Sequence, residues 1–161
     1  GLWAELGCLR RAISVAHPRL AAHLESLGLD VAIFGPGWYL TLFTRILPRA
    51  EVGAALAALA ARSLAPTHLA LGVLLASREA LLAAETFDAA VHALCGTICA
   101  SRARRAPAGV LARAFDAAAL LPLAALAAIR TAECKASASE AGASECGSTR
   151  APPAKRARRP H

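Results

Sequence analysis

The sequence predicts an all-α protein, a compact multi-helix bundle with a disordered C-terminal tail. Ala, Leu, Arg and Glu, which have high helix propensity, dominate residues 1–130, and no long alternation of polar and apolar residues indicates a strand. Residues 131–161 contain no Leu, Ile, Val or aromatic residue, so they lack the apolar side chains that would offset their ordering entropy. We therefore expect an all-helical domain over 1–130 and a basic, low-complexity, disordered tail over 131–161.

Proline and glycine set the expected bounds of the first three helices. The first covers residues 2–15. The second starts at Pro18, because proline is favoured in the first helical turn, and stops at Gly28, a residue that commonly ends helices. The third begins near Pro36 and ends before Pro48. Its apolar side chains follow helical spacing: Trp38, Leu42, Phe43 and Ile46.

The remaining expected helices follow one another at short intervals. Short connections favour antiparallel packing of neighbouring helices in a compact bundle. Their expected ranges are 51–62, 66–84 as one bent helix, 87–100, 107–120 and 122–129.

Composition and charge exclude several classes of protein. The 18 Lys and Arg residues exceed the 11 Asp and Glu residues, which gives a net charge of +7. The longest run without these residues, 63–77, is shorter than the roughly 18–20 residues that a transmembrane helix needs. The first residues do not resemble a signal peptide, and the five cysteines show no framework spacing. We expect a cytoplasmic protein with reduced thiols and no transmembrane segment, and the absence of Met predicts a piece of a longer protein.

No enzyme motif is present in the sequence. The turn at residues 35–37 is too short to hold a phosphate and is expected to be a loop before a helix. His92, Cys95 and Cys99 fall on one face of an expected helix, but a structural zinc site needs a fourth ligand and none follows at the usual spacing. We therefore favour a small apolar helix face, and expect no catalytic residue, no metal and no cofactor in this chain.

A dense basic cluster at residues 155–159 is compatible with an anionic surface, a nucleic acid or a nuclear import signal. It has no interleaved aromatic residues for base stacking, which argues against single-strand binding. We favour a solvated tail with at most a weak contact to anionic surfaces and no specific nucleic acid, with nuclear location as the alternative.

The most informative segment runs from residue 18 to residue 82. It contains His23-Leu24, then Trp38-Tyr39-Leu40-Thr41-Leu42-Phe43 followed by Pro48, then Ala70-Leu71-Gly72-Val73-Leu74-Leu75, and finally Glu79-Ala80-Leu81-Leu82. This order resembles the second half of the TBC domain, the family of Rab GTPase-activating proteins. The resemblance is clear over about 65 residues and loose over most of residues 1–115. The residues that carry it are His23, Leu24, Trp38, Leu40, Leu42, Phe43, Pro48, Leu71, Leu74, Leu75, Leu81 and Leu82.

The sequence departs from the family pattern in three places. Ala57 stands where the family has Asp, and Arg62-Ser63 stand where it often has Glu-Gly. The family's catalytic Ile-x-x-Asp-x-x-Arg and Tyr-x-Gln segments, which belong to the first half of the domain, are absent. The single Tyr39 is followed by Leu40-Thr41, and the chain contains no Gln.

The resemblance implies a regulator of a Rab-family small GTPase rather than an enzyme in its own right. Activators of this kind supply an arginine, and in this family a glutamine, to the GTP of their partner. This chain would be the supporting helical half of a TBC-like domain, inactive alone, in a cytoplasmic protein peripheral on endomembranes that acts in vesicle trafficking. The alternatives are a non-catalytic module that binds a GTPase and a helical protein-interaction scaffold.

Overall fold

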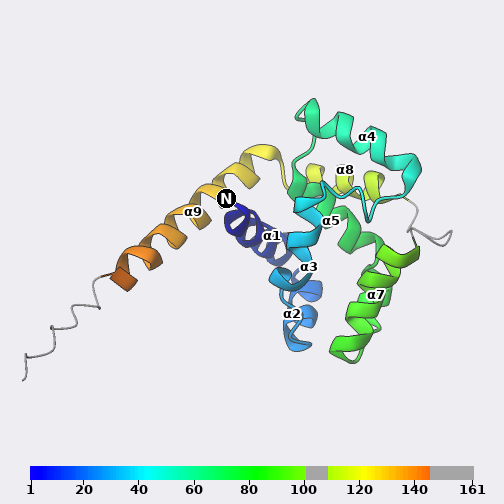
Figure 1. Ribbon diagram of the computed structural model, residues 1–161, viewed down its shortest axis with the longest axis horizontal. Helices are drawn as coiled ribbons and strands as arrows, with labels where there is room; N and C mark the ends of the chain where they lie inside the picture. Colours follow the sequence, from blue (N-terminus) through cyan, green and yellow to red (C-terminus); the bar gives the residue numbers. More distant parts are fainter. Residues whose placement is uncertain (101–108, 146–161) are drawn as a thin grey trace, which may run out of the picture.

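The computed structural model describes residues 1–100 and 109–145, with side chains over 1–94 and 109–136. These residues form helices without a strand, so the predicted all-α class and compact bundle are confirmed (Figure 1). The helices are α1 (Leu2–Ala16), α2 (Pro18–Ser26), α3 (Val31–Leu40), α4 (Arg49–Ala60), α5 (Pro66–Ala76), α6 (Arg78–Leu82), α7 (Phe87–Ala100), α8 (Val110–Leu120) and α9 (Leu123–Glu145).

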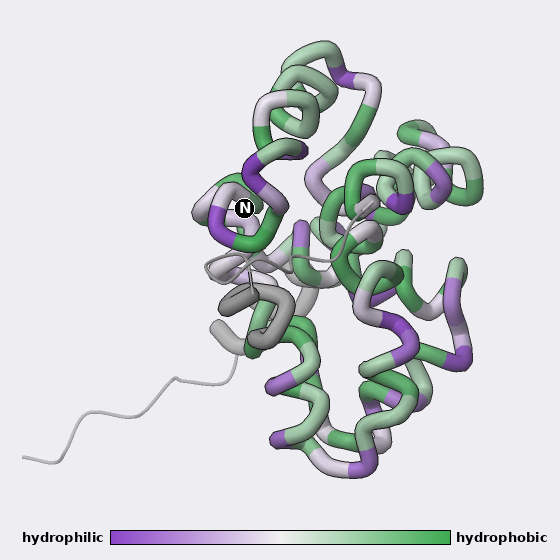
Figure 2. The backbone as a smooth tube through the Cα atoms, turned by 90° about the vertical axis from the view of Figure 1, so that its right-hand side faces the viewer, coloured by the Kyte–Doolittle hydropathy of each residue, from purple (hydrophilic) through white to green (hydrophobic). Residues whose placement is uncertain are grey.

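Helix α5 is the centre of the bundle. Every residue from Thr67 to Leu74 is buried, as its apolar composition requires. Helix α8 packs most extensively against it, and α1 and α3 contact it as well. At the crossing with α8, a Cβ atom on Gly72 would stand 2.6 Å from the carbonyl oxygen of Val110, so only glycine permits this approach. Along the chain, short hydrophilic stretches interrupt mostly apolar helical segments (Figure 2).

Helix α1 packs between the other N-terminal helices and α9. The thiol of buried Cys8 donates to the carbonyl oxygen of Leu126 at 3.7 Å, and burial raises the pKa of this thiol. Arg130 forms an ion pair with Glu5, with Nε and Oε1 2.8 Å apart. Segments far apart in the sequence are thereby held together.

The predicted tail boundary at residue 131 falls inside helix α9 (Leu123–Glu145). Helix α9 continues through it to Glu145, and Figure 1 shows α9 extending away from the bundle. Ala and Glu, which are frequent in this stretch, sustain a helix that is already nucleated, although they supply no apolar core. Residues 146–161 lie outside the described residues.

The predicted start of the third helix is wrong. Helix α3 begins at Val31 because the Asp30 carboxylate caps it, accepting the Ala32 N–H at 2.7 Å. The turn expected at residues 35–37 is therefore helical, and Pro36 lies inside α3. Gly35 is buried against α1, where a Cβ atom would stand 2.5 Å from Leu6 Cδ2.

Helix α3 ends at Leu40, well before the predicted end at Pro48. Leu42 and Phe43 have φ angles of 47° and 61°, in the left-handed region that favours glycine. The N–H of Phe43 donates to the Trp38 carbonyl at 2.9 Å and that of Leu42 to the Tyr39 carbonyl at 3.1 Å, a Schellman ending. This turn buries the Phe43 ring 5.5 Å from the ring of Tyr39, which offsets the backbone strain.

Other boundaries differ less from expectation. The expected bent helix over 66–84 is divided at Ser77 into α5 and α6. The helix expected from residue 107 is described from Val110. The N-terminus of α8 is capped by α4, because the Glu51 carboxylate accepts the N–H groups of Gly109 at 3.0 Å and Leu111 at 2.7 Å.

Candidate functional site: two grooves beside helix α3

The residues of the resemblance divide into core and surface positions. Pro48 directly precedes α4, half-buried like Leu75. Leu40, Leu42 and Leu82 are exposed. The buried members are Leu24, Trp38, Phe43, Leu71, Leu74 and Leu81.

His23 joins α2 to the end of α6. Its Nε2 lies 3.0 Å from the carbonyl oxygens of both Leu81 and Ala84. Two acceptors at this distance require the tautomer with its hydrogen on Nε2. His23 therefore has a structural role, because its N–H group hydrogen-bonds backbone carbonyls at the C-terminus of α6.

An exposed apolar strip follows α3 and the turn after it. Ile33, Gly37 and Leu40 are spaced i, i+4 and i+7 on one side of the helix, and Leu42 follows in the turn. The side chains of Ile33, Leu40 and Leu42 are 54%, 75% and 52% exposed. Nothing lies within 4 Å of a Cβ atom placed on Gly37. We call these four residues the α3 face.

A groove of about 410 Å³ lies between α3, the turn after it and α7. We call it the Trp38 groove. Its walls are largely apolar, with the Thr41 hydroxyl and the Arg45 guanidinium as its polar side-chain groups beside the Trp38 indole. The residues that line it are Leu29, Ile33, Phe34, Gly37, Trp38, Thr41, Arg45, Ile46, Val91 and Leu94.

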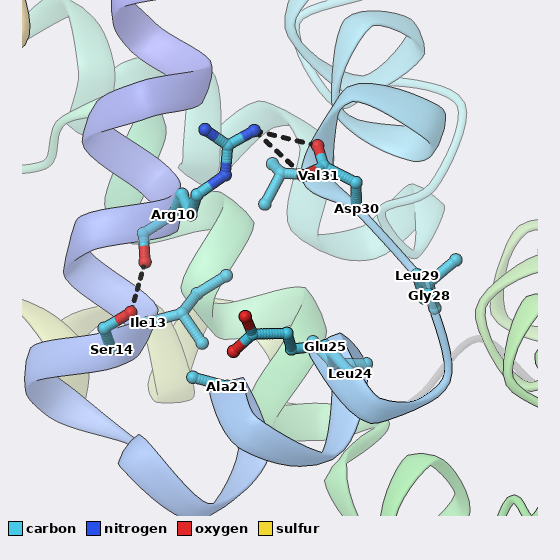
Figure 3. Close-up of a pocket in the computed structure, with 10 residues that line it drawn as sticks. All are labelled: Arg10, Ile13, Ser14, Ala21, Leu24, Glu25, Gly28, Leu29, Asp30 and Val31. Atoms are coloured by element: carbon cyan, nitrogen blue, oxygen red, sulfur yellow. Dashed lines mark hydrogen bonds and ion pairs between the residues drawn. The ribbon is translucent and has the colours of Figure 1, made fainter.

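A second groove of similar volume, the Arg10 groove, lies where α1, α2 and the start of α3 meet (Figure 3). Arg10 Nη2 lies 2.9 Å from both carboxylate oxygens of Asp30, and Ser14 donates to the Arg10 carbonyl at 3.1 Å. The Ala32 N–H, and then Arg10, hold the pKa of the Asp30 carboxyl below its ordinary value of 3.8. Figure 3 shows the Glu25 carboxylate directed toward the space below Arg10. Because the Arg10–Asp30 pair is solvent-exposed, it positions α3 against α1 and adds little stability.

The histidine and cysteine residues do not assemble into a metal site in the described part of the chain. No group of three or more His, Cys, Asp or Glu side chains there is placed to hold an ion. His92 is exposed on α7, and the side chains of Cys95 and Cys99 lie outside the described residues. Cys134 is a free, exposed thiol on α9, whereas Cys146 and the basic cluster at 155–159 lie outside the description.

A test for membrane-crossing helices was applied to the described residues. No single helix there has both the length and the apolar character needed to cross a bilayer. One pair, Val110–Leu120 with Leu123–Ala136, meets the length and composition criteria together across a 78° bend.

Sequence reasoning missed two features of the Trp38 groove. Ile33 was not assigned to a helix face, and Arg45 was placed in a continuous helix rather than in the turn after α3. Asp30 was the available signal, because an Asp before an apolar run marks a helix N-terminus. With α3 started there, Ile33 and Leu40 align on one side.

Comparison of the chain with family models, with curated proteins and with solved structures finds no match.

Proposed function

We propose that this chain is a non-catalytic helical module that binds a Rab-family small GTPase through the α3 face. The single observation that carries the proposal is the exposure of Leu40 and Leu42 beside Ile33. Large apolar side chains gathered on one exposed strip are typical of protein-binding surfaces, because solvating them is unfavourable. Gly37 in the middle of the strip lets a partner's backbone approach α3 closely.

The partner class comes from the resemblance. Leu40 and Leu42 belong to the Trp38–Pro48 stretch, in which the likeness to TBC domains is strongest. Buried residues of that stretch, such as Trp38 and Phe43, build the core. Leu40 and Leu42 are not part of the core. Packing therefore does not explain why these positions are leucine, whereas a role in binding does.

The second candidate is the supporting half of a TBC-like activator. The same exposure of Leu40 and Leu42 favours it, because a half-domain presents apolar side chains that its other half covers. In this role the α3 face contacts a helical half-domain and the chain supplies no catalytic side chain. Both candidates use the α3 face. They differ in what covers it: a Rab GTPase in the first candidate, and the other half of a TBC-like domain in the second.

Calorimetry with purified Rab GTPases, loaded with a non-hydrolysable GTP analogue or with GDP, tests the first candidate. The Leu40→Ser/Leu42→Ser double variant should bind at least about tenfold more weakly than the unchanged chain. Trp3→Ser is the matched control, because Trp3 is a large apolar residue that is 73% exposed on a different helix, α1. Absence of binding to every Rab tested, or equal binding by the double variant, would overturn the proposal.

Two further measurements separate the roles. The chain alone should not accelerate GTP hydrolysis by any Rab, and a dose-dependent acceleration would contradict the non-catalytic assignment. For the second candidate, the probe is a purified N-terminal half of a TBC domain from a Rab activator. Restored hydrolysis with the unchanged chain, and its loss with the double variant, supports that candidate over the first.

A further inference from the structure

The carboxylate of Glu25 lies in the Arg10 groove without a partner. Figure 3 shows it directed from α2 toward α1, below Arg10 and beside Ile13. No ion pair or hydrogen bond of the Glu25 side chain occurs within the described part of the chain. Because Glu25 is exposed, a molecule that enters the groove from solvent can reach this charge.

The other charged groups of the groove are already paired with each other. Both carboxylate oxygens of Asp30 lie 2.9 Å from Arg10 Nη2, and one of them also accepts the Ala32 N–H at 2.7 Å. The charges of Arg10 and Asp30 therefore cancel locally. Glu25 is the remaining charged residue of the lining, so the groove is negative although the chain as a whole carries +7. This charge favours a cation as the occupant.

The rest of the groove suits an apolar group. Its apolar lining comes from half-buried Ala21 and from the core residues Ile13, Leu24 and Leu29. Exposed Gly28 also lines the groove, and nothing lies within 4 Å of a Cβ atom placed on it, so this side stays open. The volume of about 410 Å³ lies within the range of pockets that hold small ligands.

We propose that the Arg10 groove binds a small organic amine in its protonated form. The ammonium group donates to the Glu25 carboxylate, and the hydrocarbon part lies against the apolar lining near Ala21 and Leu29. A neutral alcohol of the same size loses the charge attraction, and a carboxylate is repelled by Glu25. A divalent metal ion prefers several oxygen ligands, which one unpaired carboxylate does not supply. The site shares no residue with the α3 face and does not depend on the proposed binding of a GTPase.

Titration of the full chain, followed by the NMR signals of its backbone amides, tests the proposal. The probes are cyclohexylmethylamine, cyclohexylmethanol and sodium cyclohexanecarboxylate, which have similar size and differ in charge. The amine should shift the signals of Gly28 and Leu29 saturably. The alcohol should bind at least about fivefold more weakly, and the carboxylate should give no saturable shift. Absence of a saturable shift with the amine, shifts that lie only outside the groove, or equal binding of amine and alcohol would overturn the proposal.

Three substitutions at exposed positions test the role of the Glu25 charge. Glu25→Gln keeps the size of the side chain and removes its charge, so it should weaken binding of the amine about fivefold. Glu79→Gln removes a carboxylate on α6, outside the groove, and should leave binding unchanged. Glu25→Asp keeps the charge on a shorter side chain and should bind more tightly than Glu25→Gln. Equal binding by Glu25→Gln and the unchanged chain would contradict the assignment, as would equal weakening by Glu79→Gln, which indicates general charge attraction.

Discussion

The imidazole Nε2 of His68 donates a hydrogen bond of 2.7 Å to the carbonyl oxygen of Leu121. Its Nδ1 accepts the N–H of Ala65 at 3.0 Å. His68 is therefore neutral, with its hydrogen on Nε2, and joins the start of α5 to the end of α8. A second proton, on Nδ1, would face the Ala65 N–H and break that contact.

Stability should fall when the pH drops below about 6.5. Burial lowers the pKa of His68 from 6.5, so below this pH the unfolded chain binds more protons than the folded chain and unfolding is favoured. Burial lowers the pKa of His17 in the same direction. Urea unfolding between pH 7.5 and 5.0 should show a falling midpoint. His68→Gln should flatten this dependence and exposed His92→Gln should preserve it; equal slopes for all three chains would refute the role of His68.

The close approach of α5 and α8 predicts that Gly72→Ala destabilises the fold by about 1–3 kcal/mol. The added Cβ atom would meet the Val110 carbonyl oxygen and the Ala114 Cβ atom, neither of which can rotate away. Gly53→Ala in α4 is the matched control, because nothing lies within 4 Å of its added Cβ atom. That change should stabilise the chain by about 0.5–1 kcal/mol through helix propensity. Thermal unfolding measures both, and a neutral Gly72→Ala would show that the helices can separate without cost.

The carboxylate of Glu51 should stabilise the first turn of α8. Glu51→Ala leaves the N–H groups of Gly109 and Leu111 without their acceptor, at a cost of about 1–3 kcal/mol. Hydrogen exchange of these two amides should accelerate more than that of amides in α5. Glu79→Ala, an exposed position on α6, should change neither exchange nor stability. Unchanged protection in Glu51→Ala would show that the cap is not populated in solution.

The end of α4 predicts a stabilising substitution. Arg62 has a φ of 55°, and the N–H of Ser63 donates to the Ala58 carbonyl at 3.0 Å, which is a Schellman ending with arginine where glycine is favoured. Arg62→Gly should raise the free energy of unfolding by about 1 kcal/mol. Gly28→Ala is the reciprocal test, because Gly28 occupies the same place after α2 with a φ of 70° and has open space around it. It should lower stability by a similar amount, and changes of the opposite sign would exclude backbone strain as the cause.

Most of the fold could be predicted from local signals. Pro18 and Gly28 bound α2 almost as expected, and α7 has the predicted bounds of 87–100. The predicted bounds of a helix were wrong where two local signals for a helix start competed. Pro36 indicated a helix start, but the Asp30 side chain supplies a stronger one six residues earlier.

The end of α3 could not be predicted in the same way. Leucine and phenylalanine rarely adopt positive φ, so nothing local marks Leu42 and Phe43 as a turn. Burial of the Phe43 ring in the core sets their conformation, and this depends on the tertiary fold. The Trp38 groove and the exposure of Leu40 follow from that turn, which explains why sequence reasoning did not find the groove.

The contact between α1 and α9 has a consequence for synthesis on the ribosome. Glu5 and Arg130 are 125 positions apart, so at about 5–20 residues per second α1 exists for roughly 6–25 s before Arg130 is made. During this interval the side of α1 that carries Cys8 has no α9 to cover it. The nascent chain therefore exposes this side of α1 until its partner helix emerges.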